Sequence, residues 1–210
     1  MASGFPLPLR NALAELAIAG LHDDEARAAL AWLAAGRTDP PFPAVGARLA
    51  EAHLVETDGR LLAVHAPWAD AVRAHAARAV AAARARSRSA AGTPVVEALR
   101  DAVALWNARL FFEVHEVLEA VWKTAAGPLR QGLQGVIQVA VAYHHLAHDN
   151  ARGARTLMRD GRARLADVDR EVLSPLDAGA LLAETDVWET ALVHGRPLPP
   201  APPALRLCAG

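Results

Sequence analysis

Residues 129–148 constrain the fold most, because a helix made from them is apolar on almost every side. At about 100° per residue, one polar stripe interrupts the apolar surface and carries Gln131, Gln134, Gln138 and His145. A helix that is apolar nearly all round is a central, buried helix. The segment therefore predicts a helical bundle built around it, in which the polar stripe must meet water or another polar group.

The flanking sequence extends this bundle. Thr93-Pro94 is typical of a helix start, since proline fits the first helical position, and helical patterns continue to about residue 194. Short connections make sequential helices antiparallel neighbours. We therefore expect an all-α bundle over residues 94–195, followed by a proline-rich tail over 196–210 that is either an extended strap or disordered.

The first part of the chain predicts a separate domain. Residues 1–85 contain helical stretches and one pair of alternating apolar runs around Thr57-Asp58-Gly59, and Asp-Gly between such runs predicts a β-hairpin. Helices followed by a hairpin resemble a winged-helix domain. Residues 86–93 are small, polar and basic, which predicts a linker.

Charge and composition restrict the partners. The 210 residues include 22 basic and 23 acidic side chains, and the third helix of the first part offers little besides Arg48 for reading DNA. We therefore expect nucleic-acid binding to be at most weak and non-specific. No apolar run is long enough to span a membrane. We expect no secretory signal, and a disulfide framework is excluded because Cys208 is the single cysteine. These features predict a cytoplasmic protein, and a homo-oligomer stays open.

A second helix, expected over about 110–124, places polar groups on a face that should be buried. His115 and Glu119 lie in the middle of a face that is otherwise apolar, Glu116 lies at its edge, and Glu113 falls on the opposite side. The pattern predicts that His115 and Glu119 are buried and that Glu113 is a solvated surface charge.

The two polar stripes are expected to meet. If the helices are antiparallel, His115 and Glu119 face Gln134, Gln138 and His145, and the small Gly135 and Ala142 beside that stripe allow close approach. On this prediction, Glu119→Ala should cost roughly 1–3 kcal/mol, because it leaves buried donors unpaired.

Three motifs in this region resemble a known family. The segments FFEVHEVLEAVWK, LQGVIQVAVAYHHL and NARGA are similar to the H-E-x-x-E-x-x-W, Q-G-x-x-Q and N-x-x-G-A motifs of the bacterial and archaeal family called Domain of Unknown Function 309. The resemblance covers about residues 95–203. It implies an all-α fold and no particular reaction, and the first 90 residues lie outside it.

The motif residues allow three kinds of site. H-E-x-x-E lacks the second histidine of zinc proteases, and the paired E-x-x-H helices of di-iron bundles are absent. The cluster is then a ligand or catalytic pocket, a metal site of another kind, or a buried hydrogen-bond network. For the pocket, we take His115, Glu116 and Glu119 as candidate catalytic residues, with no assigned metal and with the cofactor unknown. The candidate ligand-binding residues are Trp122, Gln134, Gln138 and His145.

Two function classes follow from these alternatives. The first is a small-ligand-binding or enzymatic bundle with a His/Glu/Gln polar pocket. The second is a non-catalytic regulatory or interaction protein, whose polar cluster is structural and whose N-terminal domain contacts protein or DNA. Whether the protein is an enzyme stays open.

Overall fold

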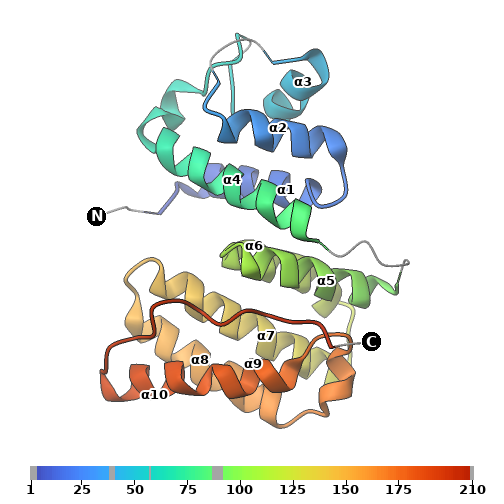
Figure 1. Ribbon diagram of the computed structural model, residues 1–210, viewed down its shortest axis with the longest axis vertical. Coiled ribbons are helices and arrows are strands. Elements are labelled where there is room, and N and C mark those ends of the chain that lie inside the picture. Colours follow the sequence, from blue (N-terminus) through green and yellow to red (C-terminus); the bar gives the residue numbers. More distant parts are fainter. Residues whose placement is uncertain (1–3, 38–40, 57, 87–91, 209–210) are drawn as a thin grey trace.

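The computed structural model describes residues 4–37, 41–56, 58–86 and 92–208, and these parts of the chain are mainly helical (Figure 1). The all-α prediction is therefore confirmed. No helix in these described parts is long and apolar enough to cross a membrane.

The helices form two groups that are stacked along the long axis of the molecule (Figure 1). The N-terminal group contains α1 (Leu7–Ala19), α2 (Asp24–Ala34), α3 (Pro43–Glu51), the 3-10 helix η1 (Ala63–Trp68) and α4 (Ala69–Ala85). The C-terminal group contains α5 (Pro94–Asn107), α6 (Phe111–Trp122), α7 (Gly127–Leu146), α8 (Ala151–Ala166), the 3-10 helix η2 (Arg170–Leu173), α9 (Ala178–Glu184) and α10 (Asp186–His194).

Several helices begin where the sequence provides a cap. The Asp23 side chain accepts hydrogen bonds from the first-turn amides of α2, Thr93 does the same for α5, and Asn150 does the same for α8. Each of these side chains satisfies backbone N–H groups that lack a partner inside the helix. Local sequence alone therefore determines these three starts.

The predicted β-hairpin is reduced to one isolated antiparallel bridge, between Val55 and Leu61. Beyond Leu62, whose amide donates to the Leu54 carbonyl at 3.0 Å, the chain turns into η1 instead of continuing as a strand. Pro67 lies within η1 and has no N–H for a strand ladder. The hairpin and the winged-helix resemblance are thus not supported, and Thr57 of the expected turn lies outside the described residues.

Helices α7 and α8 approach very closely. A Cβ atom added to Gly161 would lie 2.8 Å from the Gly135 carbonyl oxygen, and one added to Gly135 would lie 3.0 Å from the Gly161 carbonyl oxygen. Only glycine leaves room for two backbones at this separation. The side of α7 that carries Gly135 therefore packs on α8.

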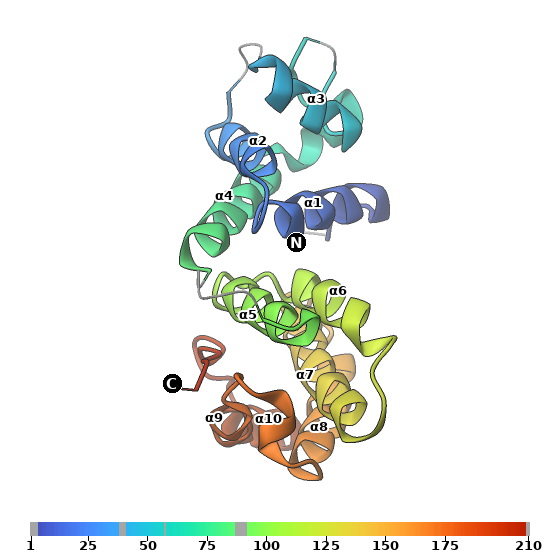
Figure 2. The same cartoon turned by 90° about the vertical axis from the view of Figure 1, so that its right-hand side faces the viewer.

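The two groups of helices are joined by a shared apolar core and by ion pairs, with α1 and α4 above α5 and α6 (Figure 2). His22 Nε2 lies 2.8 Å from Asp101 Oδ2, and Arg86 pairs with both Asp101 and Glu97. Of the predicted linker 86–93, residues 87–91 lie outside the described residues.

The proline-rich tail is an extended strap up to residue 208, and it crosses the C-terminal group (Figure 1). Trp106 Nε1 donates to the Pro203 carbonyl at 2.8 Å, and the Asn107 side chain exchanges two hydrogen bonds with the backbone of Leu205, each 2.9 Å long. The buried side chain of Leu205 and these hydrogen bonds hold the strap against α5.

Candidate functional site

The H-E-x-x-E residues lie together on α6, but they are not buried. The side chains of His115, Glu116 and Glu119 keep 29%, 39% and 33% of their exposure. His115 Nδ1 lies 3.0 Å from Glu116 Oε1, and Lys123 Nζ lies 3.0 Å from Glu119 Oε2 and lowers the pKa of that carboxyl group. The expectation that His115 and Glu119 are fully buried is therefore corrected.

These three side chains are near enough to share a cation. One ligand atom of each lies within 4.8 Å of the others. The charge of Glu119 is, however, already compensated in part by Lys123. A metal-binding or catalytic role of His115, Glu116 and Glu119 stays a prediction.

The polar stripe of α7 faces α8 and not the α6 cluster. Arg164 on α8 donates from Nε to Gln138 Oε1 at 3.0 Å and from Nη1 to Gln131 Oε1 at 2.6 Å. The close packing of Gly135 on α8 turns this side of α7 towards Arg164. The expected meeting of the two stripes is therefore corrected, since an arginine on α8 supplies the donors for the glutamines.

The remaining predicted ligand-binding residues are also dispersed. His145 Nδ1 accepts a hydrogen bond from Asn150 Nδ2 at 2.9 Å at the start of α8, and the Trp122 ring lies under the Arg130 guanidinium at 3.8 Å. Gln134 is half-buried on α7. The ligand-binding role of these residues and of Gln138 stays a prediction.

The surroundings of Glu119 change the expected effect of its mutation. Glu119→Ala should alter the free energy of unfolding by about 0.5 kcal/mol or less, because an exposed pair at positions i and i+4 contributes little. Urea unfolding of the variant and the wild type measures this difference. If the free energy of unfolding of the variant falls by more than about 1 kcal/mol, Glu119 has a buried partner.

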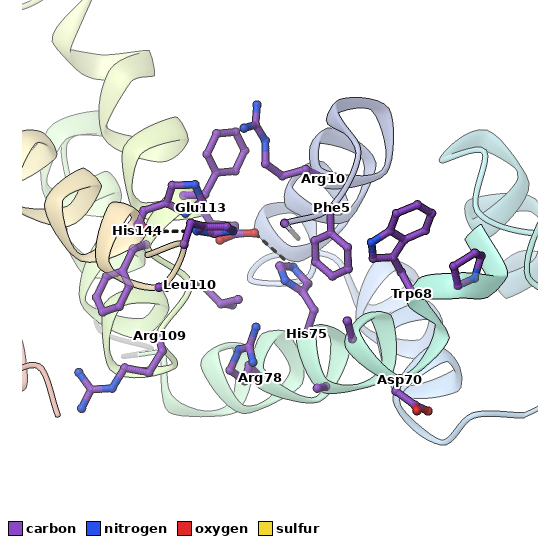
Figure 3. Close-up of a pocket in the computed structure, with 18 residues that line it drawn as sticks. Phe5, Arg10, Trp68, Asp70, His75, Arg78, Arg109, Leu110, Glu113 and His144 are labelled. Atoms are coloured by element: carbon purple, nitrogen blue, oxygen red, sulfur yellow. Dashed lines mark hydrogen bonds and ion pairs between the residues drawn. The ribbon is translucent and has the colours of Figure 1, made fainter. Parts of the chain in front are cut away.

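A cavity of about 750 Å³ lies between the two groups of helices, away from the predicted residues (Figure 3). Its walls come from the segment before α1 and from α1, η1, α4, the joint between α5 and α6, α6, and the end of α7. Sequence reasoning missed it, because its two walls are formed by residues that are far apart in the chain.

Three arginine residues contribute to the lining of this cavity. Arg78 and Arg109 are exposed and make no ion pair with the described parts of the chain, and Arg10 lies 4.1 Å above the Phe112 ring. The Nε atom of Arg10 is buried and has no hydrogen-bond partner among the described residues. The cavity therefore holds cationic groups whose hydrogen-bonding capacity is largely unused.

The two carboxylates of the cavity do not cancel these charges. Asp70 is paired with Arg73, which lies outside the lining, and Glu113 faces His75. Since Arg10, Arg78 and Arg109 are not paired with either carboxylate, the site favours negative charge.

His75 and Glu113 form a buried pair across the cavity. Figure 3 shows the two side chains pointing towards each other from α4 and α6, with 3.2 Å between His75 Nε2 and Glu113 Oε1. Their side chains keep only 7% and 3% of their exposure, and the contact lacks the alignment of a good hydrogen bond. The prediction that Glu113 is a solvated charge is therefore wrong, because α1 and α4 cover this side of α6. The one sequence signal for the pair is that His75 lies among the buried positions of α4, beside Val72 and Ala76.

His144 adds a neutral imidazole to the cavity. Burial, followed by the nearby His148 and Arg10, lowers the pKa of His144 to about 4. The centroid of its ring lies 5.8 Å from that of Phe112 and 4.4 Å from that of His148. At neutral pH this imidazole therefore carries no charge and offers one donor and one acceptor nitrogen.

One comparison with known proteins gives a match. Residues 99–157 match the family model described as Domain of unknown function (DUF309). The resemblance to DUF309 is thereby confirmed. No match is found among curated proteins or solved structures.

The DUF309 segment supplies only one wall of the cavity. It runs from α5 into α8 and includes Arg109, Glu113 and His144. Arg10 and His75, on the opposite wall, lie outside it. The cavity is thus formed where the N-terminal group of helices covers the DUF309 segment.

Proposed function

We propose that the protein binds a small anionic ligand in the cavity between its two groups of helices. The observation that carries this proposal is that Arg10, Arg78 and Arg109, none of which forms an ion pair with the described residues, line a cavity of about 750 Å³. Sites for small molecules typically have volumes of about 300–1,000 Å³ and a few convergent polar groups. The ligand-binding class is therefore favoured over a purely structural role.

The types of side chain specify the ligand chemistry. A guanidinium donates two parallel hydrogen bonds to a carboxylate or phosphate, which makes arginine well suited to such groups. Arg78 and Arg109 supply these donors, and the neutral His144 supplies a further donor or acceptor. Carboxylates and phosphates are the anions that this set of donors recognises best.

The alternative, a regulator that reads DNA, has less support. Arg48 is the main candidate for a base contact, yet its guanidinium lies 2.9 Å from both Asp23 and Glu51. An arginine held by two carboxylates neutralises little phosphate charge. We therefore still expect nucleic-acid binding to be at most weak.

Calorimetric titration with citrate and with pyrophosphate tests the proposal. Both anions should bind the wild type, and Arg78→Ala and Arg109→Gly should each weaken binding about tenfold, because each removes a charge-assisted hydrogen bond. Glycine suits position 109, where φ is +62°.

A matched control separates the site from general charge effects. Arg152 is exposed on α8 outside the cavity, so Arg152→Ala should leave the affinity unchanged. If neither anion binds, or if Arg152→Ala weakens binding as much as Arg78→Ala, the proposal is wrong.

A further inference from the structure

A second, more open groove of about 440 Å³ adjoins the cavity. Its walls come from α6, α7, α10 and the strap, which contributes Leu198 and the prolines that follow it. The described segments thus place a mainly apolar groove next to a cationic cavity.

The two spaces share part of their lining. Arg109, Phe111 and Ala147 line both the cavity and the groove. In Figure 3, Arg109 lies at the end of the cavity opposite Trp68. Its guanidinium can therefore bind an anionic group at the border while the rest of the same molecule extends into the groove.

The groove has aromatic walls. The rings of Phe111 and Tyr143 are stacked with 5.2 Å between centroids, and the Trp188 ring meets Tyr143 edge-on at 5.0 Å. Leu198 completes the wall and is 40% exposed. The three aromatic residues are only 7%, 2% and 5% exposed, so a ligand ring would meet their edges and would pack mainly on Leu198 and the prolines of the strap.

Charge also selects the orientation of the ligand. Arg109 is the one charged residue in the lining of the groove, and no ion pair occupies it within the described residues. The anionic group of a ligand is therefore favoured beside Arg109 and in the cavity, and its apolar part is favoured against Leu198 and the prolines that follow it.

We propose that the ligand is a free aromatic anion, whose charged group lies in the cavity beside Arg109 and whose ring lies in the groove under the strap. This inference rests on the proposed anion-binding function and specifies its ligand class. The groove then determines which anions bind tightly, since every anion can use the arginines but only an aromatic one also fills the groove.

Calorimetry with naphthalene-2-sulfonate and methanesulfonate tests the inference, because the two probes share the anionic group and differ in the ring. The naphthalene compound should bind at least tenfold more tightly. Arg109→Gly should weaken its binding about tenfold, because the charged end loses its partner. Leu198→Gln should weaken it about fivefold, because apolar contact with the ring is lost.

The controls separate the groove from the cavity. Leu198→Gln should leave citrate binding unchanged, since citrate has no ring to place in the groove. Val193 is 49% exposed on α10 and does not line the groove, so Val193→Gln should change neither affinity. Thermal unfolding of each variant checks that it is folded.

Each contrary result has a distinct meaning. If citrate and pyrophosphate bind but naphthalene-2-sulfonate binds no more tightly than methanesulfonate, the aromatic ligand class is wrong and the anion site remains. If neither Arg109→Gly nor Leu198→Gln changes the affinity for naphthalene-2-sulfonate, the inference is also overturned, because the probe then binds elsewhere. If none of the anions binds, the proposed function itself is wrong.

Discussion

Replacing His75 with leucine is expected to lower the free energy of unfolding by about 3 kcal/mol. Glu113 is 2% exposed, and His75 is its one ion-pair partner among the described residues. Leucine fills most of the imidazole volume, so the loss comes from a carboxylate that stays buried without its partner. Chemical denaturation of the variant and the wild type at pH 7 measures it.

The double variant separates burial of charge from loss of packing. Replacing both His75 and Glu113 with leucine should restore the free energy of unfolding to within about 1 kcal/mol of the wild type, because no unpaired charge remains. If the single His75→Leu variant loses less than about 1 kcal/mol, the pair does not stabilise the junction between α4 and α6. A double variant as unstable as the single one would contradict the explanation by charge.

Acidification is expected to destabilise the protein through His144. Its pKa is about 4 in the folded chain, below the ordinary value of 6.5, so between these pH values the unfolded chain binds a proton that the folded chain does not. The free energy of unfolding should therefore fall as the pH drops from about 6.5 to 4 and should be unaffected by this group above 6.5. Because His144 is only partly buried and solvent screens its charge, the expected loss is about 1–2 kcal/mol.

A variant without the imidazole isolates this effect. Between pH 7 and pH 4, the free energy of unfolding of His144→Asn should fall by about 1–2 kcal/mol less than that of the wild type. Urea unfolding at several pH values measures this difference. Arg10, Glu113, His145 and His148 all act on His144 electrostatically and are present in both proteins, so the difference between them reports His144 alone. If the free energy of unfolding changes equally with pH in the two proteins, the pKa of His144 is not lowered in the folded chain.

Much of the fold could be predicted because it depends on local patterns. Thr93 begins α5 as expected, and Asp23 and Asn150 begin α2 and α8 by the same local capping. The apolar surface of residues 129–148 predicts a buried helix, and α7 packs on both α6 and α8. These features depend on backbone capping and on the helical period, which act within one segment of the chain.

The candidate site could be predicted only in part. The sequence correctly places His115, Glu116 and Glu119 on one helix, and their ligand atoms lie close together. It does not predict their exposure, because the helical period gives the face of a residue and not the element that covers that face.

The sequence by itself determined the helical class, three of the helix starts, the buried character of α7 and the DUF309 motifs, since each of these is written in residues close together in the chain. Only the tertiary structure decided which helix covers which face. The Gly135–Gly161 contact turns the glutamines towards Arg164, and α1 and α4 bury Glu113 against His75. The cavity and the groove exist for the same reason, because contacts between distant segments, and not the pattern within one helix, determine where polar groups meet.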